Sequence, residues 1–150
     1  MRYVLLLLVA FCGSVHADTG LVVVKSAHNV KDTADRLESL LKNKGVDVVA
    51  RVNHAQAAKK AGMDLRPTEV LIFGNPKAGT PLMQCAQTIG IDLPQKALIW
   101  EDEKAQVWLA YNDQQYLAKR HGAAKCGEAV NNMSETLANF AKAATGNEKK

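Results

Sequence analysis

The sequence predicts an α+β fold in which a mostly antiparallel five-stranded sheet packs against helices. Two observations predict this class. Five short runs rich in β-branched and aromatic residues are interspersed with four or five segments of helical periodicity. Two of the runs, residues 97–100 and 106–111, are separated by the charged stretch 102–104, which is typical of a hairpin turn. That hairpin makes at least these two strands antiparallel.

The first seventeen residues predict a secretory signal peptide. Arg2 gives a positive start, residues 4–11 form an unbroken apolar run, and the small residues Val15 and Ala17 occupy the two positions that a signal peptidase reads. The run is too short to span a bilayer as a helix. We therefore expect a periplasmic or secreted mature chain that begins at Asp18 and has no membrane contact after cleavage.

Removal of residues 1–17 leaves 133 residues, a length that suits one domain. We expect this domain to cover residues 18–145 and the polar tail 146–150 to fray. The whole chain carries a formal charge of +4. Its Lys and Arg residues are not clustered with stacking aromatic residues, as they are in nucleic-acid-binding modules. We therefore expect no nucleic-acid partner.

The cysteines predict one disulfide bond. Cys12 lies in the predicted signal peptide, so that Cys85 and Cys126 remain as an even pair in an oxidising compartment. The alternative is two buried thiols that act as small hydrophobic side chains. The pair is not a C-x-x-C motif and does not indicate thioredoxin-like catalysis. A lipid anchor on Cys12 would need a small preceding residue, and Phe11 stands there instead.

The first strand and helix are predicted at the start of the mature chain. The β-branched run at 21–24 is typical of a buried strand. Asn29 can then cap a helix, and Asp32 lies in the first turn, where an acidic side chain complements the helix dipole. Apolar residues at helical spacing follow, and Gly45 ends the helix.

Residues 46–54 alternate between apolar and polar side chains and predict the second strand. We expect four residues to form its core-facing row: Val46, Val48, Ala50 and Val52. His54 continues the phase of this row at the exit of the strand. A short helix is predicted at 55–61, ending at Gly62.

The remaining elements follow the same logic. The apolar run 70–73 predicts a central strand between turn-forming residues. Thr80 is expected to cap the next helix, with Pro81 at its first position and its end near Gly90. Asp113 is expected to cap another helix. The apolar spacing of a final amphipathic helix is given by Val130, Met133, Leu137, Phe140 and Ala144.

His54 is the best single candidate for a functional side chain. An imidazole at the end of a core-facing row would lie at the edge of the sheet, where pockets form, and it titrates near neutral pH. The alternative is a structural histidine whose ring is satisfied by hydrogen bonds. The spacing of His28, His54 and His121 does not assemble a metal site. We therefore predict no metal site, and no motif identifies a cofactor.

Six segments, taken in order, resemble a known family: residues 52–54, 68–76, 79–84, 91–94, 100–102 and 111–112. Together they resemble the bacterial domain of unknown function 302 family over about residues 19–121, and the exported, cysteine-bearing form is similar to its proteobacterial branch. The resemblance implies a TT1751-like α+β fold, often homodimeric, and no assigned reaction. It matches the family at His54, Asn75–Pro76, Leu93–Pro94 and Tyr111–Asn112.

These observations predict an uncharacterised exported protein that serves as a small-ligand-binding or interaction module. We expect a small pocket with a polar mouth at His54, to which Asn75 and Tyr111 contribute according to the resemblance. One alternative is an enzyme that uses His54 as general base. Another is a metal- or haem-handling protein with His54 as a ligand. The expected partners are a second copy of the chain and a small molecule.

Overall fold

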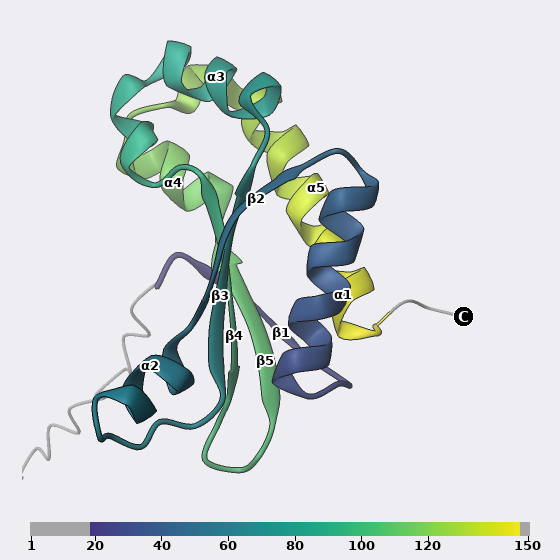
Figure 1. The fold of residues 1–150 in the computed structure, drawn as a ribbon. Helices are drawn as coiled ribbons and strands as arrows, with labels where there is room; N and C mark the ends of the chain where they lie inside the picture. Colours follow the sequence, from purple (N-terminus) through teal and green to yellow (C-terminus); the bar gives the residue numbers. More distant parts are fainter. Residues whose placement is uncertain (1–18, 148–150) are drawn as a thin grey trace, which may run out of the picture.

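The computed structural model describes residues 19–147 and shows an α+β fold, as predicted (Figure 1). Its antiparallel sheet has the strand order β1-β5-β4-β3-β2. The strands are β1 (Leu21–Lys25), β2 (Asp47–Asn53), β3 (Thr68–Gly74), β4 (Gln95–Glu101) and β5 (Val107–Asn112). The turn between β4 and β5 is the hairpin that the sequence predicts. The predicted signal peptide and residues 148–150 of the tail lie outside the described residues.

Two long helices lie side by side on one face of the sheet, and the shorter helices gather at its ends (Figure 1). The helices are α1 (Val30–Asn43), α2 (His54–Lys60), α3 (Pro76–Cys85), α4 (Gln114–Arg120) and α5 (Gly127–Thr145), with the 3-10 turns η1 (Gln87–Ile91) and η2 (Ala124–Cys126). Two predicted caps are present. The side chain of Asn29 accepts from the Asp32 N–H at 2.8 Å, and that of Asp113 accepts from the Gln115 N–H at 2.8 Å.

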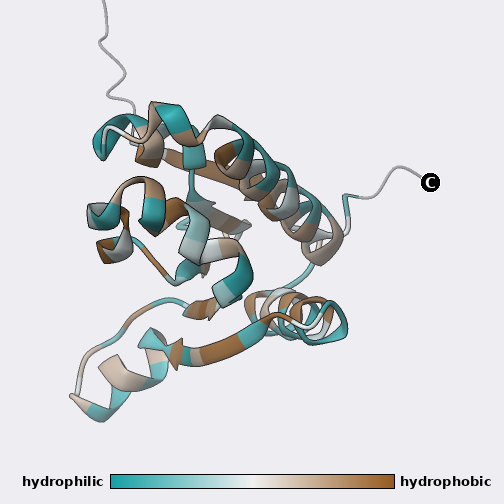
Figure 2. Ribbon diagram, turned by 90° about the horizontal axis from the view of Figure 1, so that it is seen from above, coloured by the Kyte–Doolittle hydropathy of each residue, from teal (hydrophilic) through white to brown (hydrophobic). Residues whose placement is uncertain are grey.

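The main hydrophobic core lies between α1, α5 and the covered face of the sheet, where hydrophobic positions concentrate on the strands (Figure 2). Its fully buried side chains include Leu37, Leu41, Leu71, Ile99 and Leu109. A second, smaller cluster joins α3, η1, α4 and the start of α5, and it contains Leu82, Ile89, Leu117, Ala118, Ala123, Cys126 and Val130. Met133 on α5 packs against both clusters.

The other face of the sheet, which α1 and α5 do not cover, has an apolar centre, with Lys25 and Lys96 in the rows on either side of it. A continuous row of small and branched apolar residues crosses all five strands by direct pairing: Val23, Ala110, Leu98, Val70 and Val52. In the next row Trp108 pairs with Trp100, and both are half-buried. The ends of the first row are exposed, at 48% for Val23 and 37% for Val52.

The predicted alternation of the second strand is wrong after Val48. The pairing of β2 with β3 shifts between Val48 and Ala50, which is a β-bulge, and Val49 is 64% exposed. A bulge adds one residue and reverses the facing of all that follow. Arg51 therefore turns toward the helix-covered face, where it bonds to buried Glu69, and Val52 turns away from the main core.

The predicted start of the third long helix is also wrong. The structure caps α3 with Asn75, whose side chain accepts from the Lys77 N–H at 2.9 Å, and places Pro76 at the first position. Thr80 and Pro81 lie inside α3, which ends at Cys85. Both Asn-Pro and Thr-Pro offer a cap followed by a proline, and the helix begins at the first of them.

The start of the tail is held in place. Gly146 ends α5 in the left-handed region at a φ of 76°, which glycine adopts without strain. The Asn147 side chain then donates to the Lys25 carbonyl at 2.7 Å and so ties the tail to β1. In the described part of the chain, none of the helices has the length and apolar character needed to cross a membrane.

Candidate functional site

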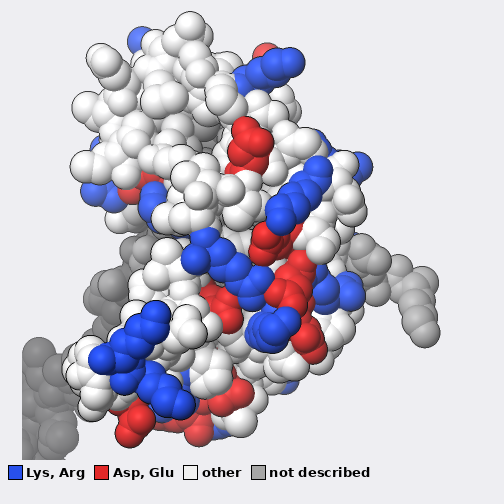
Figure 3. All heavy atoms as spheres, viewed as in Figure 1, with Lys and Arg blue, Asp and Glu red and all other residues white. Residues whose placement is uncertain are grey.

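A cavity of about 370 Å³ lies at the end of the sheet where β3 passes into α3. Its walls come from four parts of the chain, namely the start of β2, the β3–α3 junction, the segment from η1 to β4, and α5. The apolar walls are Val49, Met83, Leu93, Pro94 and Met133. The surface over α3 carries few charges, whereas charges of both signs alternate over α1 and β2 (Figure 3). A cavity of this size and character suits a small, largely apolar molecule.

Three glycines allow these segments to approach one another closely. A Cβ atom on Gly74 would lie 3.3 Å from Cβ of Pro94, and one on Gly90 would lie 3.3 Å from Sδ of Met83. Both distances are tighter than ordinary contact, so a side chain at either position would push the opposing wall away. At Gly79 a Cβ would lie 3.7 Å from Cδ1 of Leu93, which is ordinary contact. The shape of the cavity therefore depends on glycine at these positions, because a larger residue would alter the spacing of its walls.

Polar groups lie at defined points of this cavity. Gln95 is 3% exposed, and its amide exchanges two hydrogen bonds of 3.1 Å with the amide of Gln114. Gln114 also donates to the Asn112 carbonyl at 3.0 Å, which fixes the orientation of the pair. A primary amide has two donors and two acceptor lone pairs. The Gln95 amide thus retains capacity for one donated and one accepted hydrogen bond beyond those that it makes with described residues.

The structure does not bring the predicted site residues together. Asn75 lines the cavity and caps α3 with its Oδ1. His54 is the exposed first residue of α2, and it follows the end of β2 that pairs with Glu69, far along β3 from Gly74. Its ring makes no hydrogen bond to any described side chain or backbone group. The bulge in β2 removes the core-facing phase on which the prediction for His54 depended.

Tyr111 is a core residue in the structure. It is 6% exposed and belongs to the main hydrophobic cluster beneath α1 and α5. Burial, with a smaller effect from the charge of Asp113, raises the pKa of its phenol. A neutral phenol inside the core packs as a large aromatic side chain.

A larger polar hollow, of about 730 Å³, lies beside α2 and is lined by the two neighbours of His54, Asn53 and Ala55, but not by His54 itself. Its buried carboxylate, Glu69, accepts from Nε of Arg51 at 2.7 Å and from Nδ2 of Asn53 at 3.1 Å. This carboxylate is satisfied by internal partners. The hollow is therefore lined by the carboxylate of a structural ion pair, whose cation, Arg51, does not line it.

The guanidinium of Arg51 is shared by three acidic side chains. Besides Glu69, its Nη1 contacts Asp35 at 2.6 Å and Glu38 at 3.2 Å. Burial opposes the charge, but the hydrogen bonds to Glu69, Asp35 and Glu38 outweigh it and raise the pKa of Arg51 above its usual value. Arg51 is therefore a fixed cation that joins β2, β3 and α1.

His121 is held in a clamp beside the cavity. Its Nε2 lies 2.6 Å from Oδ2 of Asp92, and its Nδ1 lies 3.1 Å from Oγ1 of Thr88. An ionised Asp92 only accepts, so Nε2 of His121 carries a proton and donates it to Asp92, while the Thr88 hydroxyl can either donate to Nδ1 or accept from it. The clamp fastens η1, which forms one wall of the cavity, to the end of α4. Within residues 19–147, no group of three or more His, Cys, Asp or Glu side chains is arranged to hold a metal ion.

Sequence reasoning missed Gln95, Met83 and Met133 as cavity residues. Nothing local distinguishes them, because Gln95 lies in an ordinary strand and the two methionines fit helical spacing. The sequence feature that marks this cavity is the grouping of glycine and proline around 74–79 and 90–94, which by itself indicates turns.

Comparisons with known proteins agree with the geometry of the fold. A family model described as "Domain of unknown function DUF302" matches residues 22–140. The crystal structure of an uncharacterized conserved DUF302 protein from Bacillus stearothermophilus matches with a TM-score of 0.75 and 18% identity, over 84% of this chain and 98% of that one. At this identity the likeness shows the fold alone.

Curated relatives match at higher sequence identity. Proteins named fluoride-specific ion channel FluC 1 from Brucella suis and FluC 2 from Brucella melitensis are each 52% identical over 104 residues, which is 69% of this chain. The matched stretch spans 41% and 38% of those two proteins, respectively. This chain therefore corresponds to about two fifths of the length of the relatives.

Proposed function

The chain belongs to the DUF302 family, and we propose that it is an exported small-ligand-binding module whose ligand occupies the cavity between α3, η1 and β4. The observation that carries the proposal is the convergence of four chain segments on one cavity with apolar walls and a buried amide, that of Gln95. Small-molecule sites commonly combine such walls with a few fixed polar groups. The expected ligand is uncharged and largely apolar, with one group that hydrogen-bonds to an amide.

A thermal-shift screen tests this proposal. The probes are uncharged molecules of up to about 12 heavy atoms that each carry one amide or hydroxyl group. A ligand present at 100 times its Kd adds about 2.7 kcal/mol to the free energy of unfolding, which a melting curve resolves easily. We expect at least one probe class to raise the Tm of the wild-type protein.

A matched pair of helix glycines distinguishes the cavity from other binding surfaces. Gly79→Leu adds a side chain beside Leu93, inside the cavity, whereas Gly127→Leu adds one where nothing lies within 4 Å. The first substitution should abolish the shift, and the second should preserve it. Equal shifts in both variants, or no shift in the wild type with any probe, would contradict the proposal.

Sodium fluoride forms a separate arm of the screen, because the Brucella relatives are named fluoride-specific channels. Most of the cavity walls are apolar, the charged residue that lines it is the acidic Asp47, and no Lys or Arg lines it among the described residues. A small anion without a positive partner would lose more hydration than it regains there. Fluoride alone should leave the Tm unchanged; stabilisation by fluoride and by no uncharged probe would contradict the proposed ligand class.

Export is proposed on the sequence of residues 1–17, and the Cys85–Cys126 disulfide is compatible with it, because such bonds persist in oxidising compartments. N-terminal sequencing of the protein recovered from the periplasm or medium should begin at Asp18. Retention of Met1, or an acyl group on Cys12, would contradict this cleavage.

The open face of the sheet supports a second copy of the chain as partner. Strands about 4.8 Å apart and about 20 Å long give a face of roughly 480 Å², so that two copies would bury about 1,000 Å² in total, near the lower limit for a specific interface. The central row, from Val23 to Val52, contains no charge, and a two-fold axis can pair it with itself without like-charge repulsion. Trp100 and Trp108 add aromatic area of the kind enriched at interfaces.

Sedimentation equilibrium tests this partner. Val23→Lys places a charge in the row and should convert the dimer to a monomer, since an unpaired charge would be desolvated at the interface. Ile91→Lys is the control, because Ile91 is 76% exposed on η1, away from that face. A wild-type protein that sediments as a monomer at all concentrations would refute the proposed dimer.

A further inference from the structure

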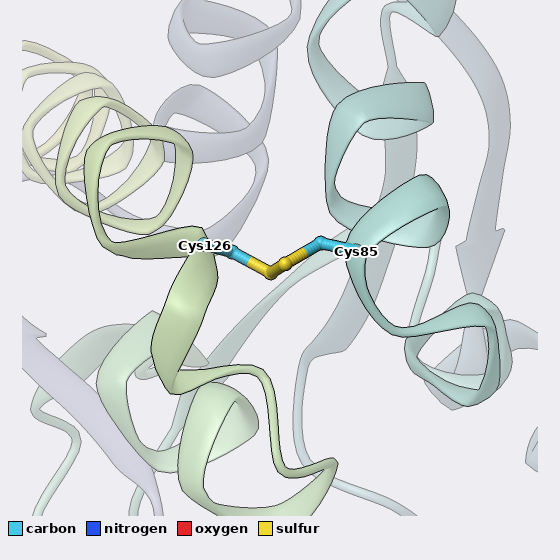
Figure 4. The surroundings of a disulfide bond; sticks show 2 residues. All are labelled: Cys85 and Cys126. Carbon is cyan, nitrogen blue, oxygen red and sulfur yellow. A yellow bond between two sulfur atoms is a disulfide. The ribbon is translucent and has the colours of Figure 1, made fainter.

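The disulfide bond joins the end of α3 to the start of α5 (Figure 4), and both of its cysteines line an open surface hollow. Cys85 is the last residue of α3, and Cys126 comes directly before α5; their Cα atoms are 6.0 Å apart. Both cysteines line a hollow of about 430 Å³, together with Lys125 and Glu128. A molecule that approaches from solvent can therefore reach the bond through this hollow.

The two sulfur atoms lie at helix ends of opposite polarity. Cys126 stands at the N-terminus of the 19-residue helix α5, where the helix dipole and the preceding Lys125 favour a negative charge. No side chain caps this terminus. Cys85 stands at the C-terminal end of α3, where the dipole opposes a negative charge. Glu128, in the first turn of α5, acts against Lys125 at the same hollow.

The bond also lies outside the main core. Cys126 and the residues that contact Cys85 belong to the smaller cluster around α3, η1 and α4. The sheet with α1 and most of α5 forms a separate set of buried contacts. Opening the bond would therefore remove the covalent link between the end of α3 and the start of α5 and leave the packing of the sheet in place.

From these observations we propose that Cys85–Cys126 is a thiol–disulfide exchange site that accepts electrons from a dithiol partner. The partner's thiolate attacks Sγ of Cys85, the S–S bond breaks, and its electron pair leaves on Sγ of Cys126 as a thiolate. The partner's second thiolate then attacks the sulfur of its own half of the mixed disulfide and releases Cys85 as a thiolate. The partner leaves as a disulfide, this chain is reduced by two electrons, and both thiolates take up protons according to pH.

The direction of attack follows from two features of the bond. Cys126 is the more buried cysteine, at 7% exposed, whereas Cys85 is half-buried, so that an incoming sulfur meets Cys85 first. A thiol of lower pKa is also the better leaving group, and the N-terminus of α5 stabilises the thiolate of Cys126. The access of the incoming thiol and the stability of the leaving thiolate therefore both favour attack on Cys85 with Cys126 as the leaving group.

Reduction kinetics test the exchange site in the wild-type protein. Dithiothreitol is added to the folded protein and to the guanidinium-unfolded chain, and free thiols are trapped by alkylation and counted by mass spectrometry. An exchange site should be reduced in the folded state at a rate within about tenfold of that in the unfolded chain. A folded-state rate more than about tenfold slower would overturn the proposal and leave the bond a structural cross-link.

Mapping of the adduct and charge variants test which cysteine is attacked and which one leaves. With glutathione as the attacking thiol and rapid acid trapping, the adduct should lie mainly on Cys85; an equal distribution or a majority on Cys126 would overturn the assignment.

Lys125→Gln should slow reduction by about two- to threefold and Glu128→Gln should accelerate it by a similar factor. Lys104→Gln, in the remote hairpin turn, is the matched control and should change nothing. If Lys125→Gln and Glu128→Gln leave the rate unchanged, the proposed stabilisation of the Cys126 thiolate is wrong.

Discussion

The buried pair of Arg51 and Glu69 allows a prediction whose magnitude follows from the structure. The Glu69 side chain is 8% exposed and that of Arg51 is 26% exposed, and their contact is 2.7 Å. Arg51→Met would leave the Glu69 carboxylate buried, with the Asn53 amide as its remaining side-chain partner. Removing one member of a buried ion pair costs about 3–5 kcal/mol. Since Arg51 is partly exposed, we expect a loss of about 3 kcal/mol in the free energy of unfolding at neutral pH.

The pH dependence of this loss has a definite sign. The pKa of Asp35 is lowered by hydrogen bonds from Lys31 and then Arg51, and the pKa of Glu38 by hydrogen bonds from Lys42 and then Arg51. A lowered carboxyl pKa stabilises the folded state above the unfolded value, and this stabilisation is lost as the pH falls through the folded value; Arg51→Met removes the part that Arg51 causes. The difference between wild type and variant should therefore narrow from pH 7 to pH 4.

Urea denaturation followed by tryptophan fluorescence measures these free energies. Arg66→Met is the control, because Arg66 is exposed and makes one side-chain bond, of 3.2 Å to the Glu101 carbonyl, and it should cost less than about 1 kcal/mol. The double variant Arg51→Met with Glu69→Leu should recover most of the loss, because no unpaired charge remains. A loss below about 1 kcal/mol for the single variant, or no recovery in the double variant, would refute this reasoning.

Two further predictions concern a turn and a hairpin. Gly20→Ala should lower the free energy of unfolding by about 2 kcal/mol or more in urea titrations, because Gly20 has a φ of +65° and a Cβ there would lie 2.4 Å from the Tyr116 ring. A variant as stable as the wild type would contradict the packing at this turn. Trp108→Phe should raise the pKa of Asp102, since the 2.7 Å bond from the indole N–H is the main cause that lowers it. A lowered carboxyl pKa stabilises the folded state at pH values above the unfolded-state pKa, and this stabilisation is lost as the pH falls through the folded-state pKa. NMR titration of Asp102 should show a higher midpoint in the variant, and an unchanged midpoint would contradict the assigned cause.

The local part of the fold could be predicted because its signals lie within a few residues of one another. Asn29 and Asp113 cap their helices through backbone N–H groups two or three residues away. The hairpin at residues 102–104 needs only a charged turn between two apolar runs. The two caps and the hairpin were therefore predictable from neighbouring residues. The Cys85–Cys126 bond was predicted from the pair of cysteines left after the predicted signal peptide, and only the fold brings the two residues together.

The start of α3 could not be predicted, because two local signals compete. Asn75–Pro76 and Thr80–Pro81 each place a capping side chain before a proline. The choice depends on the wall that α3 must form. A start at Pro76 puts Met83 against Gly90 and Gly79 against Leu93, and these contacts bring the wall of the cavity together from residues seven and fourteen positions apart. The long-range packing decides between cap signals of similar strength.

The predicted core-facing position of His54 is wrong for a related reason, which is the ion pair that Arg51 of β2 forms with the neighbouring strand. Strict alternation would have buried Val52 and His54 and left Arg51 in solvent. The bulge at Val49 reverses that order, at the expense of exposing Val52. The reversal gives the carboxylate of Glu69 a cation at 2.7 Å, and an unpaired buried carboxylate would cost more than the apolar area lost at one valine. Glu69 lies on the next strand, eighteen residues beyond Arg51, so that no pattern within β2 contains the cause. The electrostatic requirement of a neighbouring strand thus sets the register of β2 and turns His54 out to solvent, far from the cavity at the opposite end of β3 that we propose as the ligand site.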